Sequence, residues 1–170
     1  MPRLDPLPPE HTPELRKHFE FFLTTLGFAP NSVLTMQRRP KLVQAFAQLN
    51  AAVMDPAGKV ELGLRRLIGH LATALWDFRT SALYSEKERV ALEFAIAAAQ
   101  QPNAVTDELF ALLRRHWSEE EIVEILGVVA MFGFLNRWND SMATPLEPAA
   151  AAAGEQFLGA RGWNAGKHRR

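Results

Sequence analysis

Apolar side chains recur every three or four residues along most of the chain, a spacing that places them on one face of an α-helix. No segment shows the alternation of apolar and polar residues that is typical of a strand, and no internal repeat is present. Prolines and glycines interrupt the helical pattern at the points where turns are expected. The sequence therefore predicts an all-α fold with helices that begin near Thr12, Pro40, Val60, Ser85, Thr106 and Ser118.

The stretch that begins at Ser118 has the most unusual pattern. Ser118 and Glu121 have the spacing of a capping box, and positions 122–135 leave almost no polar face. A helix that is apolar all round lies in a protein core or in a membrane. Because the apolar part covers only about 14 residues and a bilayer needs about 20, we predict a core helix.

Polar residues return together at the end of this predicted core helix. Arg137 and Asp140 are three positions apart and can form a pair, whereas Asn136 and Asp140 share a face. Buried polar groups need hydrogen-bond partners, so we expect the cluster to tie the helix end to a neighbouring loop or subunit. Lining of a ligand pocket is the alternative for the four residues Asn136, Arg137, Asn139 and Asp140.

The length of 170 residues predicts a single domain over residues 1–170. Four prolines within the first nine positions predict an extended arm over residues 1–11. The glycines and the basic residues at the other end predict a flexible tail over residues 159–170.

Composition and charge narrow the classes of partner. Nineteen basic residues balance nineteen acidic ones, and the basic pairs are not interleaved with aromatic residues, so we expect no nucleic-acid partner. The chain has no membrane-length apolar run and no apolar signal-peptide core near its start, so we expect no membrane partner and a cytoplasmic location. Its five histidines lack metal-ligand spacing. We therefore expect no metal and no other cofactor.

Several stretches taken in order carry a family resemblance, and the most specific of them is positions 134–140. The full set is 26–31, 39–40, 64–71, 76–81, 85–92, 118–125, 134–140 and 144–147. With them, most of the chain resembles the carboxymuconolactone decarboxylase and alkylhydroperoxidase D-like family. The resemblance implies a compact helical domain that assembles as trimers or hexamers. It also implies a thiol peroxidase of the antioxidant type, with a Cys-x-x-Cys pair, a nearby histidine and a glutamate on the preceding helix.

The sequence departs from that pattern at the reactive centre. It contains no cysteine, and the segment that should follow positions 64–73 is missing as a block between Thr73 and Ala74. Arg66 stands where the family's glutamate is expected. A peroxidatic thiolate attacks a peroxide oxygen and a second cysteine then closes a disulfide, so the printed chain lacks the sulfur for this reaction. Either the segment is deleted, or the natural chain has a segment that this sequence omits.

Three functions remain open at this point. The first is thiol-dependent reduction of hydroperoxides, if the redox segment exists. The second is a cofactor-free, decarboxylase-like enzyme acting on a lactone acid, in which His70 and Glu88 transfer protons and Arg66 binds the anion. The third is an inactive homo-oligomeric scaffold or partner-binding subunit. Structural alternatives are a satisfied core histidine for His70 and a helix cap for Glu88.

Overall fold

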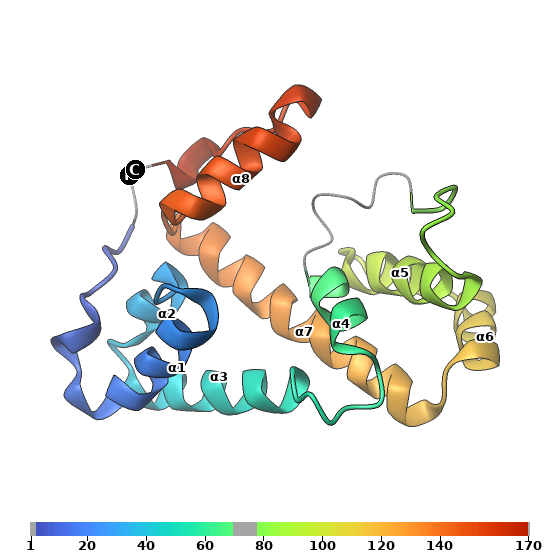
Figure 1. Cartoon of the computed structure of the whole chain (residues 1–170), viewed down its shortest axis with the longest axis horizontal. Helices are drawn as coiled ribbons and strands as arrows, with labels where there is room; N and C mark the ends of the chain where they lie inside the picture. Colours follow the sequence, from blue (N-terminus) through green and yellow to red (C-terminus); the bar gives the residue numbers. More distant parts are fainter. Residues whose placement is uncertain (1–2, 70–77, 170) are drawn as a thin grey trace. The chain divides into compact units, whose positions relative to one another are not determined.

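The computed structural model describes residues 3–69 and 78–169. These residues form helices joined by turns, and the described ranges contain no strand, so the predicted all-α class is confirmed (Figure 1). The α-helices are α1 (Arg16–Leu26), α2 (Asn31–Met36), α3 (Pro40–Val53), α4 (Leu62–Gly69), α5 (Glu86–Ala99), α6 (Asp107–His116), α7 (Glu119–Met142) and α8 (Pro148–Leu158). Short 3₁₀ helices are η1 (Pro9–His11), η2 (Pro13–Leu15), η3 (Gly159–Arg161) and η4 (Gly166–His168).

Local capping chemistry starts several of these helices where the sequence predicts. Ser85 and Glu88 form a complete capping box at the start of α5. At the start of α7 the Ser118 N–H donates to Glu121 at 2.8 Å, and the Glu121 N–H donates to Ser118 Oγ at 3.3 Å. Each box satisfies backbone N–H groups that have no partner inside the helix. The capping box predicted at Ser118 is confirmed, and the structure shows a second one at Ser85, where a helix cap was the structural alternative for Glu88.

The contacts divide the chain into two compact units, and each is described by itself. Unit 1 consists of Met1–Asn50 and Leu135–Arg170, and unit 2 consists of Ala51–Phe134. This division does not test the expectation of one domain over residues 1–170, which stays a prediction.

Unit 2 is built around one apolar core. Helix α5 packs against α4 and α6 (Figure 1). The Trp117 indole N–H donates to the Lys87 carbonyl at 3.0 Å, which joins α5 to the turn that precedes α7. The buried core consists of Val60, Leu64, Ile68, Phe78, Val90, Ala91, Leu92, Phe94, Ala95, Leu113, Trp117, Ile122, Ile125, Val128 and Val129.

Unit 1 combines a smaller apolar core with buried polar groups. Its buried apolar residues are Leu15, Phe19, Phe22, Val33, Leu34, Met36, Val43, Phe46, Ala143 and Leu158. Every residue of the short helix α2 is buried, including Asn31, Ser32 and Thr35. On α1 only the face that carries Phe19 and Phe22 is buried, and Leu23 and Leu26 are exposed.

Both ends of the chain make contacts within unit 1. The expected arm over residues 1–11 includes the 3₁₀ turn η1, where proline's fixed φ suits the first turn. Near the other end the Leu146 N–H donates to the His168 carbonyl at 3.0 Å. Trp163 lies so close to Gly154 of α8 that a Cβ at Gly154 would be 2.4 Å from the indole. The flexibility expected for residues 159–170 stays a prediction.

Helix α7 departs from the prediction of a helix buried all round. Ile122, Ile125 and Val129 are buried, but Val123 is 69% exposed and Leu126 is 44% exposed. The apolar pattern alone could not show this, since it gives the character of each face and not what covers it. One apolar face of α7 is therefore uncovered in the single chain.

A search of the described residues finds no helix long and apolar enough to cross a membrane. The expectation of a cytoplasmic location stays a prediction.

Candidate functional site

The family resemblance places the reactive centre after α4 and before the stretch that begins at Trp76. His70 and the Thr73–Ala74 junction fall between Gly69 and Phe78, so both lie outside the described residues. The described flanks of this gap are the end of α4 and the segment that leads into α5. These two flanking segments are the described parts of the candidate site.

The two arginines of α4 have opposite environments. Arg66, the predicted anion-binding residue, is exposed, whereas its neighbour Arg65 is only 1% exposed. The Arg65 guanidinium donates to three backbone carbonyls: Val60 at 2.9 Å, Val53 at 2.8 Å and Asp55 at 2.6 Å. A Cβ at Gly58 would lie 2.9 Å from this guanidinium, so the loop approaches it closely because position 58 has no side chain.

Arg65 is therefore a structural residue that sequence reasoning missed. It lies three positions before Ile68 and next to Leu64, both buried, which places it on the inward face of α4. That register is the signal that distinguishes Arg65 from Arg66. The same loop is held from α7, where the Glu124 carboxylate accepts the N–H groups of Lys59 at 2.8 Å and Val60 at 2.7 Å.

On the other flank, arginines fix the segment before α5. Phe78 is buried in the unit 2 core, and the Arg79 guanidinium lies 4.8 Å from the centre of its ring. Arg79 forms a bidentate ion pair with Glu93 of α5. Its Nε donates to Glu93 Oε1, and its Nη2 donates to Glu93 Oε2 at 2.8 Å. Arg89 of α5 donates to the Ser81 carbonyl at 2.8 Å. The edge of the candidate site is thus attached to α5.

Glu88, the predicted proton-transfer carboxylate, belongs to the α5 capping box. Its Oε2 accepts the Ser85 N–H at 2.8 Å and the Ser85 hydroxyl at 2.7 Å. These hydrogen bonds hold the pKa of Glu88 below its ordinary value. An efficient general base has a pKa near the working pH, and this carboxylate is shifted in the opposite direction. The geometry favours the helix cap over the proton-transfer role.

The predicted polar cluster at the end of α7 lies in unit 1. Asp140 pairs with Lys167 at 2.6 Å, and the Lys167 ammonium lowers the pKa of Asp140. Asn136 and Arg137 are exposed, and the buried Oδ1 of Asn139 has no hydrogen-bond partner among the described residues. Asp140 thus ties the end of α7 to the C-terminal segment, and its partner is Lys167, which the sequence pattern did not identify, since that pattern indicated Arg137.

Metal ligation finds no support in the described ranges. Residues 3–69 and 78–169 contain no group of three or more histidine, aspartate or glutamate side chains placed to hold a metal ion.

Comparison with known proteins identifies the family. No family model matches the chain. A crystal structure of the debrominase Bmp8, in a variant with a cysteine replaced by alanine and in complex with 2,3,4-tribromopyrrole, is similar over 89% of this chain and 95% of that one, with 32% identity and a TM-score of 0.81. The chain therefore belongs to the alkylhydroperoxidase D-like family.

Two further relatives add detail. The alkylhydroperoxidase core of an uncharacterized peroxidase-related protein from Ralstonia eutropha matches 87% of this chain and 93% of that one, with a TM-score of 0.72 and 20% identity, which shows the shared fold. The uncharacterized protein YnjA of Escherichia coli is 34% identical over 74 residues, a match that spans 44% of this chain and 41% of YnjA.

Proposed function

We propose that this chain is a redox-inactive member of the alkylhydroperoxidase D-like family that binds a small halogenated aromatic molecule without converting it. The observation that carries the proposal is that the fold is retained over most of the chain while the sequence contains no cysteine. A thiolate is the nucleophile in thiol-dependent reduction of hydroperoxides, and this chain supplies none.

The proposed ligand class comes from the debrominase relative. The Bmp8 variant that carries 2,3,4-tribromopyrrole has an alanine in place of a cysteine. 2,3,4-Tribromopyrrole is a small, largely apolar ring with one N–H group, and apolar pockets bind such molecules mainly through the burial of their surface. A cysteine-free chain of the same family would therefore bind such a molecule without turnover.

The decarboxylase-like alternative has weaker support. It requires a proton-transfer carboxylate, and Glu88 is engaged by the Ser85 N–H and hydroxyl. It also requires an anion-binding residue, and Arg66 is exposed on α4. If the unaltered chain turned over a lactone acid, and His70→Ala and Glu88→Gln each abolished that activity, this alternative would be supported. If the unaltered chain showed no such activity, the alternative would be refuted.

The test measures binding and turnover in the same preparation. Its intact mass is first checked against 19.0 kDa, because a larger mass would reveal a segment missing from this sequence. Titration with 2,3,4-tribromopyrrole is then followed by quenching of tryptophan fluorescence and by calorimetry. We expect saturable binding.

Turnover is measured with dithiothreitol and a metal chelator present. Bromide release is followed by ion chromatography, and loss of cumene hydroperoxide is followed in a parallel reaction. We expect neither to exceed the protein-free control. Saturable bromide release or hydroperoxide loss would refute the redox-inactive part of the proposal, and failure to bind would refute the ligand part.

A further inference from the structure

The segment that leads from the candidate site into α5 lies against one face of that helix. Residues 78–85, the exit segment, begin at the buried Phe78 and end at Ser85, the N-cap of α5. Arg89 and Glu93 follow Ser85 at intervals of four residues, so these three positions share one face of α5. Both Arg89 and Glu93 contact the exit segment.

Two contacts of opposite polarity attach the exit segment to this face. In the first contact the exit segment supplies the cation, because Arg79 Nε and Nη2 donate to the two carboxylate oxygens of Glu93, the Nη2 bond at 2.8 Å. In the second contact α5 supplies the cation, because Arg89 Nη1 donates to the Ser81 carbonyl at 2.8 Å. The exit segment therefore runs back along α5, from Glu93 toward the N-cap.

The first contact also orients the residue nearest to the candidate site. The Arg79 guanidinium lies 4.8 Å from the centre of the Phe78 ring, and Phe78 is buried in the unit 2 core. A bidentate pair fixes the plane of a guanidinium as well as its position, which a single hydrogen bond does not. Through Arg79, Glu93 thus restrains Phe78, the first described residue after Gly69.

The exposure of this pair indicates a role in geometry more than in stability. The Arg79 side chain is 57% exposed and the Glu93 side chain is 35% exposed, and exposed ion pairs contribute little to the free energy of unfolding. A binding site, in contrast, depends on supporting residues that hold its edges in position. Loss of the pair should therefore affect the ligand site more than the stability of unit 2.

We propose that Glu93 and Arg89 are positioning residues of the ligand site, which hold the exit segment and thereby one edge of the site in place on α5. The inference rests on the proposed function, since it concerns binding of the same small halogenated aromatic molecule. Neither residue contacts the ligand. Glu93 acts through Arg79, and Arg89 acts through the Ser81 carbonyl.

Glu93→Gln tests the first contact with a side chain of nearly the same size. An amide has one oxygen and one NH₂ group, so it cannot accept both hydrogen bonds from Arg79. We expect amide hydrogen exchange in residues 79–84 to rise about tenfold and the Kd for 2,3,4-tribromopyrrole to rise about fivefold, with a nearly unchanged urea midpoint. A lower urea midpoint with an unchanged Kd would show a purely structural role and overturn the inference.

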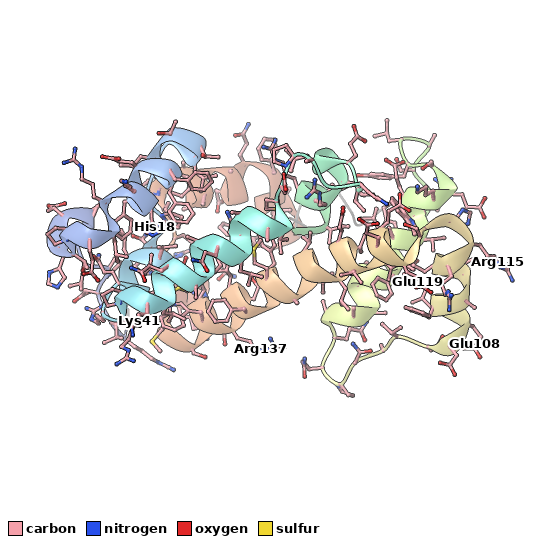
Figure 2. The ribbon with its side chains drawn as sticks, turned by 90° about the horizontal axis from the view of Figure 1, so that it is seen from below. His18, Lys41, Glu108, Arg115, Glu119 and Arg137 are labelled. Atoms are coloured by element: carbon pink, nitrogen blue, oxygen red, sulfur yellow. The ribbon has the colours of Figure 1, made fainter. Side chains whose placement is uncertain are left out.

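Glu119→Gln is the matched control. Glu119 pairs with Arg114 at 2.9 Å and both side chains are exposed, so the same change breaks a similar ion pair of unit 2 that does not involve α5. Figure 2 shows Glu119 at the first turn of α7. We expect the exchange of residues 79–84 and the Kd to match the wild type. Equal effects of Glu93→Gln and Glu119→Gln would overturn the role of Glu93.

Lysine substitutions distinguish the two contacts. The Ser81 carbonyl accepts one hydrogen bond from Arg89, so Arg89→Lys should keep a Kd near that of the wild type, whereas Arg89→Ala should raise it about threefold. Arg79→Lys cannot form two parallel bonds to Glu93, so it should resemble Glu93→Gln. An Arg89→Ala variant that binds as tightly as Arg89→Lys would overturn the role of Arg89.

The unaltered chain separates failure of this inference from failure of the proposed function. If it binds 2,3,4-tribromopyrrole and Glu93→Gln and Arg89→Ala bind equally well, the ligand part of the proposed function stands and this inference is overturned. If the unaltered chain does not bind, the ligand part of the proposed function is refuted. The exchange of residues 79–84, compared between Glu93→Gln and Glu119→Gln, then decides whether Glu93 positions the exit segment.

Discussion

The two units of the chain are stabilised by different kinds of interaction. Unit 2 has a continuous apolar cluster drawn from α4, α5, α6 and α7. Unit 1 has a smaller apolar core, and side-chain hydrogen bonds join segments that are far apart in the sequence. The Glu147 carboxylate accepts the Asn31 N–H at 2.7 Å, and the Asn31 side chain donates to the Pro145 carbonyl at 3.0 Å.

A third long-range bond in unit 1 links α7 to α2. The Trp138 indole N–H donates to Thr35 Oγ1 at 2.9 Å, across 103 positions of sequence. Apolar burial is non-directional and scales with area, so a core tolerates changes that preserve its volume. A buried hydrogen bond depends on each partner, and removal of one partner leaves the other unsatisfied. Replacement of a buried polar residue should therefore lower the stability of unit 1 more often than that of unit 2.

Arg65 is an exception to this contrast between the units. It is a buried polar side chain within the apolar unit 2, so its replacement should give the largest loss of stability. Arg65→Ala removes three donors from the carbonyls of Val53, Asp55 and Val60 and leaves a cavity. We expect a loss of about 3 kcal/mol or more in the free energy of unfolding, measured by urea denaturation.

The neighbouring residue supplies the control for this prediction. Arg66→Ala, one position away and exposed, should change the free energy of unfolding by less than about 0.5 kcal/mol. Arg65→Lys keeps the charge but cannot reach three carbonyls in the same fork, so its loss should be intermediate. Equal effects at positions 65 and 66 would contradict the structural role of Arg65.

Glu147 tests the polar character of unit 1. Glu147→Ala removes the carboxylate that accepts the Asn31 N–H at the start of α2. We expect a loss of about 2 kcal/mol, since the bond has a charged acceptor, and faster amide hydrogen exchange at the start of α2. Glu147→Gln keeps an acceptor and should lose less. An unchanged amide exchange rate at Asn31 would show that the hydrogen bond to Glu147 does not stabilise the start of α2.

Local features of the fold were predictable from sequence, and long-range ones were not. The capping boxes at Ser85 and Ser118 and the all-α class follow from residues a few positions apart, and all were confirmed. The buried state of Arg65 depends on a loop that folds back over α4. The Asp140–Lys167 pair joins segments whose proximity only the tertiary structure sets.

Less of the candidate site than of the fold could be predicted from sequence. The family was identified through resemblance across several stretches, and the comparison with Bmp8 shows it. Glu88 was a possible base by position alone, and its hydrogen bonds to Ser85 now favour a capping role. His70 and the Thr73–Ala74 junction lie outside the described residues, so their predicted roles stay predictions.

The capping box at the start of α5 gives a smaller effect that depends on pH. Ser85→Ala should cost about 1 kcal/mol at neutral pH. Because the folded-state pKa of Glu88 is lowered, its contribution is fully present above the ordinary value of 4.5 and is lost as the pH falls through the lowered pKa. The difference in urea midpoint between the wild type and the variant should therefore narrow from pH 7 to pH 3, and the remainder reflects the Glu88 N–H that donates to the Ser85 hydroxyl at every pH. Curves that stay parallel would contradict this linkage.

The smallest expected effect on stability is that of an exposed ion pair in unit 1. It shows that only the buried polar contacts of unit 1 should contribute strongly to stability. Asp140 and Lys167 form an exposed ion pair at 2.6 Å, and exposed pairs contribute little to stability because water and salt screen them. Lys167→Ala should therefore leave the urea midpoint nearly unchanged, in contrast to Glu147→Ala. It should still raise the pKa of Asp140 toward its ordinary value, since Lys167 is the main cause of the lowered pKa. Carboxyl carbon NMR titration of the two proteins measures that shift, and an unchanged Asp140 pKa would show that this ion pair does not persist in solution.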